Sequence, residues 1–349
     1  MRILVSTLLL SCLAVAPWPA GAAPCLVVTL TGTQGGPSSF NGLAGAGTLV
    51  RFGDDADDCS TVRLQFDAGR GTTMRLGQLG ITPGRLDAVF LTHMHSDHVD
   101  GFADLLQMRW HFEYRRPKLD VVCSADAMVP GFAISCRQLV AHVADAYVKS
   151  GEIAQRVTED RDRPPGGPAD VVRVVTFEPR DEAEQVWSLG DVKVMAIRST
   201  HIGGHASYRV DTPAGSVVIG GDAGNDAAAP PRRSSTSEQV EKLAQGAAII
   251  VHSAIHPAMG PDKGSKMPRA IYFRQSTASD LGAMAERAGA KHLMLTHLIP
   301  PLGAVRQGPW DVPGGPLAEA DYRKAAEEGG FAGNVVVGTD LVSVRLPAR

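Results

Sequence analysis

Short runs of hydrophobic, β-branched residues recur along the chain and predict a series of β-strands. Most of these runs are bounded by glycine, proline or polar residues, which are typical of turns. The predicted strands are 26–30, 48–52, 62–66, 88–92, 171–177, 192–197, 216–219, 248–251 and 292–296.

Helical patterns fall between these runs, and the clearest one covers 279–288. Thr277 precedes this pattern, and Asp280 lies three residues after Thr277. This capping-box arrangement favours a helix start. Strands and helices alternate in both halves of the chain. We therefore expect one α/β unit in which helices cover the sheets.

Composition places the chain among ordinary globular proteins, because 44% of its 349 residues are hydrophobic and 20% are charged. The formal net charge is -3 and the pI is about 6.4. Such a balance provides no broad basic surface for a polyanion. We therefore expect no strong nucleic-acid binding.

The first 23 residues have the features of an export signal. Arg2 is followed by an apolar run over 3–16 and by small residues over 20–23. The run is too short to cross about 30 Å of hydrocarbon, and prolines follow it. We therefore predict that 1–23 is removed and that the protein is periplasmic or secreted. Lipid attachment at Cys12 is the less favoured alternative.

The mature chain, 24–349, is predicted to form a single domain. No stretch after the signal is apolar enough to span a membrane. The sequence leaves the oligomeric state open, with a homodimer among the options. The four remaining cysteines suggest two disulfides in an oxidising compartment. Nearest-neighbour pairing joins Cys25 to Cys59 and Cys123 to Cys136, although four cysteines allow three pairings.

The segment 91–101 is dense in metal-binding side chains. His93 and His95 are two residues apart, so an extended backbone can point both at one cation. Asp97 and His98 lie on the next turn, where they can reach a second cation. These ligand types favour zinc, with manganese or iron as alternatives. The competing interpretation, an incidental histidine-rich turn, is much less favoured.

Three more candidate ligands follow predicted strands farther along the chain. His201 comes after the strand 192–197, and His297 after 292–296. Asp222 follows the glycine pair 220–221, where the backbone can approach closely. Each residue alone is an ordinary strand-end residue. Together with the first cluster they complete a candidate set for two divalent metal ions.

At this point the sequence resembles the metallo-β-lactamase-fold hydrolases, through the His-x-His-x-Asp-His motif at 93–98. Within that superfamily it is most similar to the ribonuclease Z and arylsulfatase branch. The resemblance covers most of the mature chain, and the stretches that carry it are 30–37, 66–72, 87–101, 220–222, 249–254 and 295–297.

The resemblance implies the fold and the ligand assignment. The fold is an αββα sandwich of two packed β-sheets with helices outside. One metal would be held by His93, His95 and His201, the other by Asp97, His98 and His297, and Asp222 would bridge them. His201 is preferred to His205 because of its spacing to Ser207 and Tyr208, although the family has glycine where this chain has Ser207.

Two neighbouring cations would lower the pKa of a shared water and make hydroxide available at neutral pH. Asp97 would orient this hydroxide and accept its proton. The leading hypothesis is therefore an exported hydrolase of a small-molecule ester, namely a phosphodiester, a sulfate ester or a lactone. The alternatives are a ribonuclease Z-like phosphodiesterase or endonuclease and a non-catalytic metal-binding protein of the envelope.

Two departures from the family pattern speak against the nuclease alternative. Ribonuclease Z enzymes carry a histidine thought to protonate the leaving group, and this chain has Gln275 there. The family's acidic residue after the strand 248–251 is replaced by Ser253. His205 or His256 would be substitutes, but ordinary polar loop histidines are favoured. The export signal also argues against transfer-RNA processing.

The segment 109–118 mixes basic and aromatic residues just after the metal-binding cluster. One interpretation is a substrate wall that recognises an anion or a ring. The favoured interpretation is the end of an amphipathic helix with a solvated basic tip.

Overall fold

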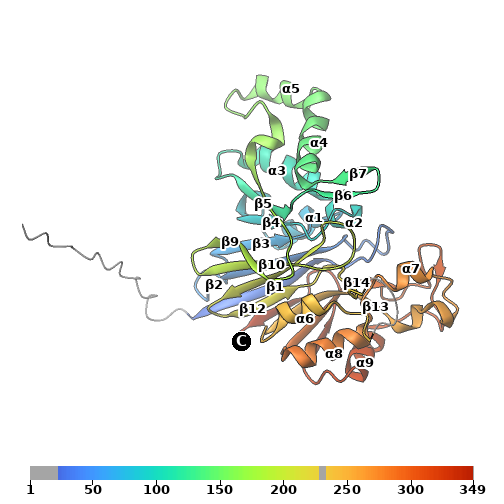
Figure 1. The fold of residues 1–349 in the computed structure, drawn as a ribbon. Coiled ribbons are helices and arrows are strands. Elements are labelled where there is room, and N and C mark those ends of the chain that lie inside the picture. The colour runs from blue at the N-terminus through green and yellow to red at the C-terminus, as the bar shows by residue number, and fades with distance from the viewer. Residues whose placement is uncertain (1–22, 228–232, 349) are drawn as a thin grey trace, which may run out of the picture.

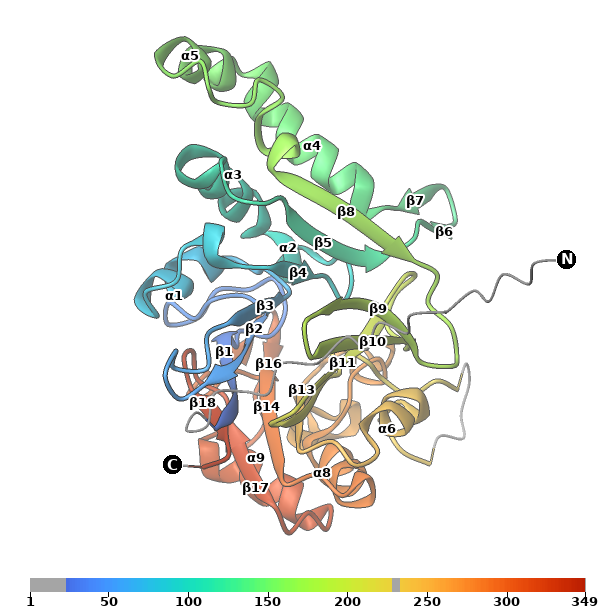
Figure 2. The same ribbon diagram turned by 90° about the vertical axis from the view of Figure 1, so that its left-hand side faces the viewer.

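The protein is described by a computed structural model that covers residues 23–227 and 233–348. Two seven-stranded sheets pack against each other, and helices cover their outer faces (Figure 1 and Figure 2). This arrangement confirms the predicted αββα sandwich. Residues 1–22, with Cys12 and nearly all of the predicted export signal, lie outside the description.

The first sheet contains the strands of the N-terminal half and one strand from the C-terminal end of the chain. The last strand of the chain pairs antiparallel with the first strand, so the two ends of the described chain meet in one sheet. In order across the sheet, the strands are β18 (Ser343–Leu346), β1 (Pro24–Gly32), β2 (Gly47–Asp54), β3 (Val62–Phe66), β4 (Ala88–Phe90), β5 (Leu119–Ser124) and β8 (Val172–Phe177).

The second sheet is built from the C-terminal half. In order, its strands are β17 (Asn334–Val337), β14 (His292–Ile299), β13 (Ile249–Ile255), β12 (Gly215–Ile219), β11 (Ala206–Thr212), β10 (Val192–Arg198) and β9 (Glu184–Leu189). Two small hairpins lie outside the sheets: β6 (Ala127–Val129) with β7 (Phe132–Ile134), and β15 (Arg306–Gln307) with β16 (Trp310–Asp311).

The helices occupy the outer layers. On the first sheet these are α1 (Thr72–Gln78), α3 (Phe102–Glu113), α4 (Cys136–Lys149) and α5 (Glu152–Glu159); on the second they are α6 (Glu238–Ala244), α8 (Ala278–Ala288) and α9 (Glu319–Glu328). The short helices α2 (Ser96–Val99) and α7 (Arg269–Tyr272) lie in loops, as do the 3-10 turns Pro83–Arg85, Gly167–Val171, Pro257–Met259 and Pro261–Lys263.

Three hydrophobic clusters hold these four layers together. The central one lies between the sheets, where the rings of Phe66 and Phe90 stack with centroids 4.7 Å apart and Tyr208 packs against both. The other two lie between each sheet and its helices. Both faces of each sheet are therefore covered. This burial explains why the predicted strands are nearly continuous hydrophobic runs.

All nine predicted strands are present, and so is the predicted helix. The side chain of Thr277 accepts a hydrogen bond from the backbone N–H of Asp280, which confirms the predicted cap. The predicted strand 88–92 ends at Phe90, because the chain turns there into the metal-binding loop. Nine further strands among the described residues, including β11 and β18, were not predicted.

Both predicted disulfides are formed. One joins Cys25 to Cys59, and the other joins Cys123 on β5 to Cys136 at the start of α4. Among the described residues, no helix is both long and apolar enough to cross a membrane.

Strand direction brings the carboxyl ends of several strands to one edge of the sandwich. β3, β4, β5 and β8 run parallel, as do β12, β13, β14 and β17. The two halves are joined at this edge by the hydroxyl of Tyr208, which donates to Leu91 O at 2.8 Å. Side chains that follow β4, β10 and β12, and those near the end of β14, therefore converge there.

Candidate metal centre

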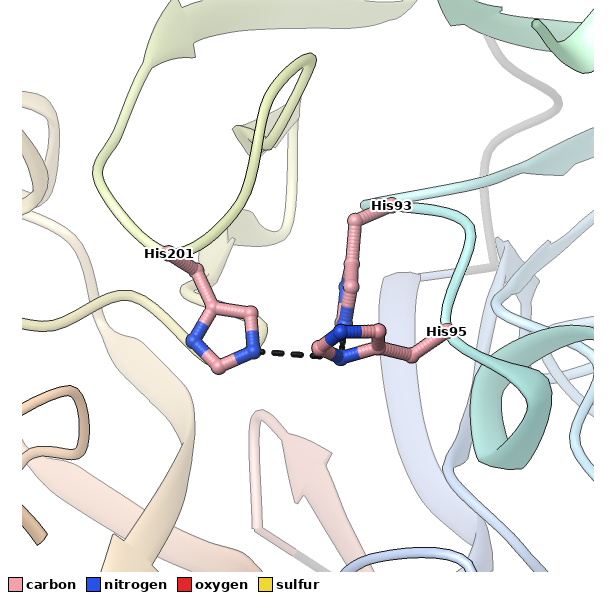
Figure 3. A group of neighbouring side chains, drawn as sticks. All are labelled: His93, His95 and His201. Atoms are coloured by element: carbon pink, nitrogen blue, oxygen red, sulfur yellow. Dashed lines mark hydrogen bonds between the residues drawn. The ribbon is translucent and has the colours of Figure 1, made fainter. Parts of the chain in front are cut away.

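The loop after β4 presents its ligands on two kinds of backbone. His95, two residues after His93, lies on extended backbone, and Asp97 and His98 lie on the first turn of α2. His201, on the loop after β10, faces this pair from the other sheet (Figure 3). His95 Nδ1 lies 3.0 Å from His93 Nε2 and 3.3 Å from His201 Nε2. This is the first predicted ligand group.

The second predicted group is equally close. Asp97 Oδ2 lies 2.9 Å from His297 Nε2 and 3.8 Å from His98 Nε2. His297 sits at the end of β14 with a backbone φ of 46°, in the left-handed region that a histidine rarely adopts. A strained backbone at such a position is typical of a functional site.

Asp222 lies between the two groups, as predicted for a bridging residue. Its Oδ2 is 3.4 Å from His297 Nε2, 3.5 Å from His98 Nε2 and 3.7 Å from His201 Nε2. The structure thus brings all seven predicted ligands together, from both sheets.

These separations fit metal coordination. Tetrahedral ligands with metal bonds of about 2.0–2.1 Å lie roughly 3.3–3.4 Å apart, close to the distances found here. The ligand atoms form three groups, each within 4.8 Å: His93, His95 and His201; His93, His98 and Asp222; and Asp97, His98 and His297. In addition, His98 Nε2 and Asp222 Oδ1 are buried without a hydrogen-bond partner. Buried polar atoms of this kind normally have a partner, so both favour a bound cation.

Asp67, directly after β3, orders two of the histidines. It accepts a hydrogen bond from His98 Nδ1 at 2.8 Å and another from the Thr92 hydroxyl at 2.8 Å. Because the Thr92 hydroxyl has given its only hydrogen to Asp67, it accepts from His93 Nδ1 at 3.0 Å. Both imidazoles therefore carry their proton on Nδ1, which leaves Nε2 free for a metal.

Sequence reasoning did not assign Asp67 a role. Its only signal was its place after a predicted strand in the shared stretch 66–72. Its backbone φ of 54° adds a second strained position at this edge of the sandwich.

The glycine pair before Asp222 is needed for packing. A Cβ on Gly220 would overlap the ring of His252. Gly221 has a φ of +61°, and a Cβ there would lie 2.9 Å from His205 Nε2. His205 supports Asp222 from behind, because its Nε2 accepts the Asp222 backbone N–H at 3.2 Å. This placement supports the choice of His201 over His205 as the ligand.

The two ligand groups differ in their electrostatics. Burial lowers the pKa of His201 to about 4, and it lowers the pKa of His93 and His95 as well. Burial also opposes a charge on His98 and His297, but Asp222 and the other neighbouring carboxylates outweigh it and raise both pKa values.

Asp97 belongs to the charged side of the site. Burial favours its neutral form, but the hydrogen bond and the charge of His297 outweigh burial and lower the pKa of Asp97 to about 2. The group formed by His93, His95 and His201 is thus neutral at pH 7, whereas Asp97 is ionised.

An open cavity of about 280 Å³ leads to the ligands. Asp97, His95, His201, Asp222 and His297 form its floor, and its walls include Pro37, Arg274, Gln275, Gln307 and Trp310. Arg274 is exposed at its mouth and forms no ion pair or side-chain hydrogen bond with another described residue. Its charge further lowers the pKa of His95 and His201, beyond the larger effect of burial.

His205 and His256 were considered as substitutes for the histidine that the family uses to protonate the leaving group, but neither lines this cavity. His205 is buried behind Asp222. His256 caps a 3-10 turn, where its Nδ1 accepts the Ala258 backbone N–H at 3.1 Å. Gln275 does line the cavity, and Ser253 is buried nearby. Among the described residues, the cavity wall therefore has Arg274 as its only ionisable side chain outside the ligand set.

Comparison with known proteins supports these observations. The profile of the family described as Anti-Pycsar protein Apyc1 matches residues 58–129. Ribonuclease Z from Mycobacterium sp. (strain KMS) is 29% identical over 330 residues, covering 91% of this chain and 95% of the relative.

Solved structures show the same fold. The metallo-β-lactamase-fold protein YhfI from Bacillus subtilis superposes with a TM-score of 0.59 at 18% identity and covers 93% of this chain and 100% of YhfI. The short form of human tRNase Z superposes with a TM-score of 0.56, also at 18% identity, and covers 92% of this chain and 100% of the human protein.

These relatives contradict one prediction. We expected a small-molecule ester substrate and no strong nucleic-acid binding, but the relatives bear the names of enzymes that act on RNA. The expectation rested on the net charge of -3, which averages over the whole surface. Cations such as Arg274 are local, and a sum of charges does not reveal them.

The metal-binding geometry, the two-sheet fold and the relatives agree. The chain has the metallo-β-lactamase fold, is similar to ribonuclease Z proteins over about nine-tenths of its length, and is a metal-dependent hydrolase.

Proposed function

We propose that the protein hydrolyses phosphodiester bonds in RNA, using two divalent cations held by the seven ligands. The observation that carries this proposal is the cavity in which ligands from both sheets meet, with the unpaired guanidinium of Arg274 at its mouth. The names of the relatives supply the substrate class.

His93, His95 and His201 would hold one cation, and Asp97, His98 and His297 the other, with Asp222 between them. Imidazole nitrogen and carboxylate oxygen favour zinc, and manganese or iron would also fit. When bound, such a cation pair supplies hydroxide at neutral pH and stabilises charge on the attacked phosphorus.

The protein's own side chains would position the reactants. Asp97, whose pKa of about 2 keeps it ionised, would hold the hydrogen of the attacking hydroxide. Arg274 would contact the phosphate oxygens, because a guanidinium forms paired hydrogen bonds to phosphate. Gln275 would donate a hydrogen bond from its amide but cannot supply a proton.

Export to an oxidising compartment is also part of this proposal. It rests on the charged, apolar and small-residue pattern of 1–23 and on two disulfides, which are rare in the cytoplasm. The removed segment and the mature single domain, 24–349, remain predictions. Mass spectrometry of the intact protein from its host would identify the mature N-terminus, and an uncleaved chain would contradict export.

The substrate is tested with zinc-loaded protein and an end-labelled single-stranded RNA, with DNA of the same sequence for comparison. We expect cleavage of the RNA and a KM that rises about tenfold in Arg274→Ala, because a charged hydrogen bond is worth about 1.5–3 kcal/mol. Arg269→Ala is the matched control, since Arg269 is an exposed arginine of α7 that pairs with Asp262. No RNA cleavage by protein that holds two equivalents of metal would contradict the proposal.

A further inference from the structure

A second cavity, of about 450 Å³, lies at the opposite end of β4 from the metal centre. Asp87, directly before β4, lines this cavity, whereas His93 follows the same strand. Five residues lie between them in sequence, three of which form β4, so the strand separates the two sites. We call this cavity the amino-end pocket; its lining includes Arg63, Arg85, Asp87, Arg109, Arg116, Lys118, Asp120, Arg173 and Trp187.

The amino-end pocket is strongly cationic in a chain whose net charge is -3. Six of its side chains are arginine or lysine, and two are carboxylates. Asp120 is already engaged, because Arg173 donates to both of its oxygens at 2.7 and 2.8 Å and the Trp187 indole donates to Oδ2 at 2.8 Å.

The other carboxylate compensates for part of this charge. Asp87 accepts the backbone N–H of Arg63 at 2.8 Å, and its charge favours the charged forms of Arg63 and Arg109, although burial raises the pKa of Asp87. Four cations of the pocket, namely Arg63, Arg85, Arg116 and Lys118, form no ion pair or side-chain hydrogen bond with any described residue.

A buried arginine holds three of these cations around one opening. Arg109 of α3 is 2% exposed, and its guanidinium donates to Pro83 O at 2.7 Å and to Pro117 O at 2.5 Å. It thereby fixes both the 3-10 turn that carries Arg85 and the loop that carries Arg116 and Lys118. This contact explains the basic and aromatic segment 109–118, whose Trp110 is buried in the core.

Holding like charges together has an electrostatic cost. Burial lowers the pKa of Arg63 and outweighs the opposing charge of Asp87, and the charges of Arg85 and Arg51 lower it further. Burial lowers the pKa of Arg109 too, against the opposing charges of Glu113 and Asp87, and Arg116 makes a small contribution in the same direction as burial. A concave, fixed cluster of unpaired cations focuses positive potential and attracts a multiply charged anion.

We propose that the amino-end pocket binds an anion that carries two or more phosphate groups. Guanidinium groups pair with phosphate oxygens in a fixed fork, and four unpaired cations match a ligand with several negative charges. The half-buried ring of Trp187 and the exposed side chain of Leu189 add an apolar wall. The volume lies in the range of small-ligand sites. This site is separate from the metal centre and does not depend on the proposed RNA hydrolysis.

Inorganic tripolyphosphate is the probe for the pocket, and the fluorescence of Trp187 is the readout. Trp310 lines the metal-centre cavity, so Trp310→Phe is the background that removes the signal of that cavity; the buried Trp110 then adds only a constant emission. We expect a saturable change in fluorescence that weakens with added salt. The double substitution Arg116→Glu with Lys118→Glu should weaken binding at least tenfold, and both residues are exposed, so the fold should be retained.

Arg115→Glu is the matched control. Arg115 is the exposed neighbour of Arg116, but it pairs with Asp162 and does not line the pocket, so this variant should bind tripolyphosphate like the parent protein. No saturable binding by the parent protein would overturn the proposal. Equal binding by the parent and the double variant would overturn it as well.

A second measurement distinguishes two sources of the phosphate groups, a free oligophosphate and an RNA backbone. If the pocket takes RNA, the double variant should raise the KM for a long RNA at least severalfold and leave the kinetics on bis(p-nitrophenyl) phosphate unchanged. If it takes a free oligophosphate, tripolyphosphate binding is lost while the KM for RNA stays the same.

Discussion

The two ends of strand β4 carry opposite kinds of chemistry. At its carboxyl end, the histidines and carboxylates are buried and contact one another, and Asp67 fixes the tautomers of His93 and His98. At its amino end, Arg85, Arg116 and Lys118 are exposed and have no partner among the described residues. One end is organised to hold cations, and the other to attract anions. A single short strand can thus separate two binding sites in a small domain.

The substitution Asp222→Ala should have the largest effect, and it tests the carboxyl end of β4. Asp222 lies within 3.7 Å of ligand atoms of both groups, so its loss should reduce RNA hydrolysis about a thousandfold or more. Activity and metal content are the measurements. Tripolyphosphate binding at the amino-end pocket should not change. Full turnover by a folded variant would show that Asp222 does not bridge the cations.

The second test concerns pH and the metal-free protein. His201 has a folded pKa of about 4 because of burial, against about 6.5 in an unfolded chain. A neutral His201 is therefore favoured in the fold above pH 6.5, and this contribution is lost as the pH falls toward 4. It amounts to at most about 3 kcal/mol of unfolding free energy.

Comparison with His201→Gln isolates this effect, because His98 and His297, with raised pKa values, contribute in the opposite direction. The free energy of unfolding of the wild type relative to the variant should fall between pH 6.5 and 4, as measured by urea titration of chelated protein. A difference that is constant over this range would contradict the buried, neutral state of His201.

The third test removes the support behind the histidines. Asp67→Asn should weaken metal binding about 10–100-fold, because the partners of ligating imidazoles tune metal affinity by this amount. Competition with a chromogenic chelator measures it. Asp100→Asn is the control, since Asp100 lies two residues after His98 but faces Arg70 at 3.9 Å instead of a ligand. Equal affinities for the two variants would argue against the role of Asp67.

The smallest expected effect is a gain. Gln275 lines the cavity and cannot donate a proton at neutral pH, so Gln275→His should speed the cleavage of RNA about tenfold. The rate with bis(p-nitrophenyl) phosphate should stay constant, because its leaving group needs no protonation. An equal change for both substrates would show that the histidine acts on binding and not on the leaving group.

The same contrast explains what could be predicted from the sequence. The metal centre was predictable because His93, His95, Asp97 and His98 are adjacent in the chain and the other ligands follow hydrophobic strands. The amino-end pocket was not, because its cations come from separate segments at 63, 85, 109–118 and 173. Only the folded chain brings such residues together, and each one alone resembles an ordinary surface residue.

Some strands were missed for a similar reason. β11, Ala206–Thr212, contains serine, arginine and aspartate, so its hydrophobic signal is weak although four of its residues are fully buried. β18 is short and lies at a sheet edge, where pairing with β1 and not its own sequence defines it. Asp67 was missed because a single carboxylate after a strand has no partner that the sequence can reveal.

The ligands of the metal centre belong to both halves of the sandwich. His93 to His98 follow β4 of the first sheet. In the second sheet, His201 and Asp222 follow strands and His297 lies near the end of β14. Bound cations would therefore act as a crosslink across the seam between the halves. A chelator should then loosen this seam as well as stop turnover, so that the working lifetime of the protein depends on the supply of free metal.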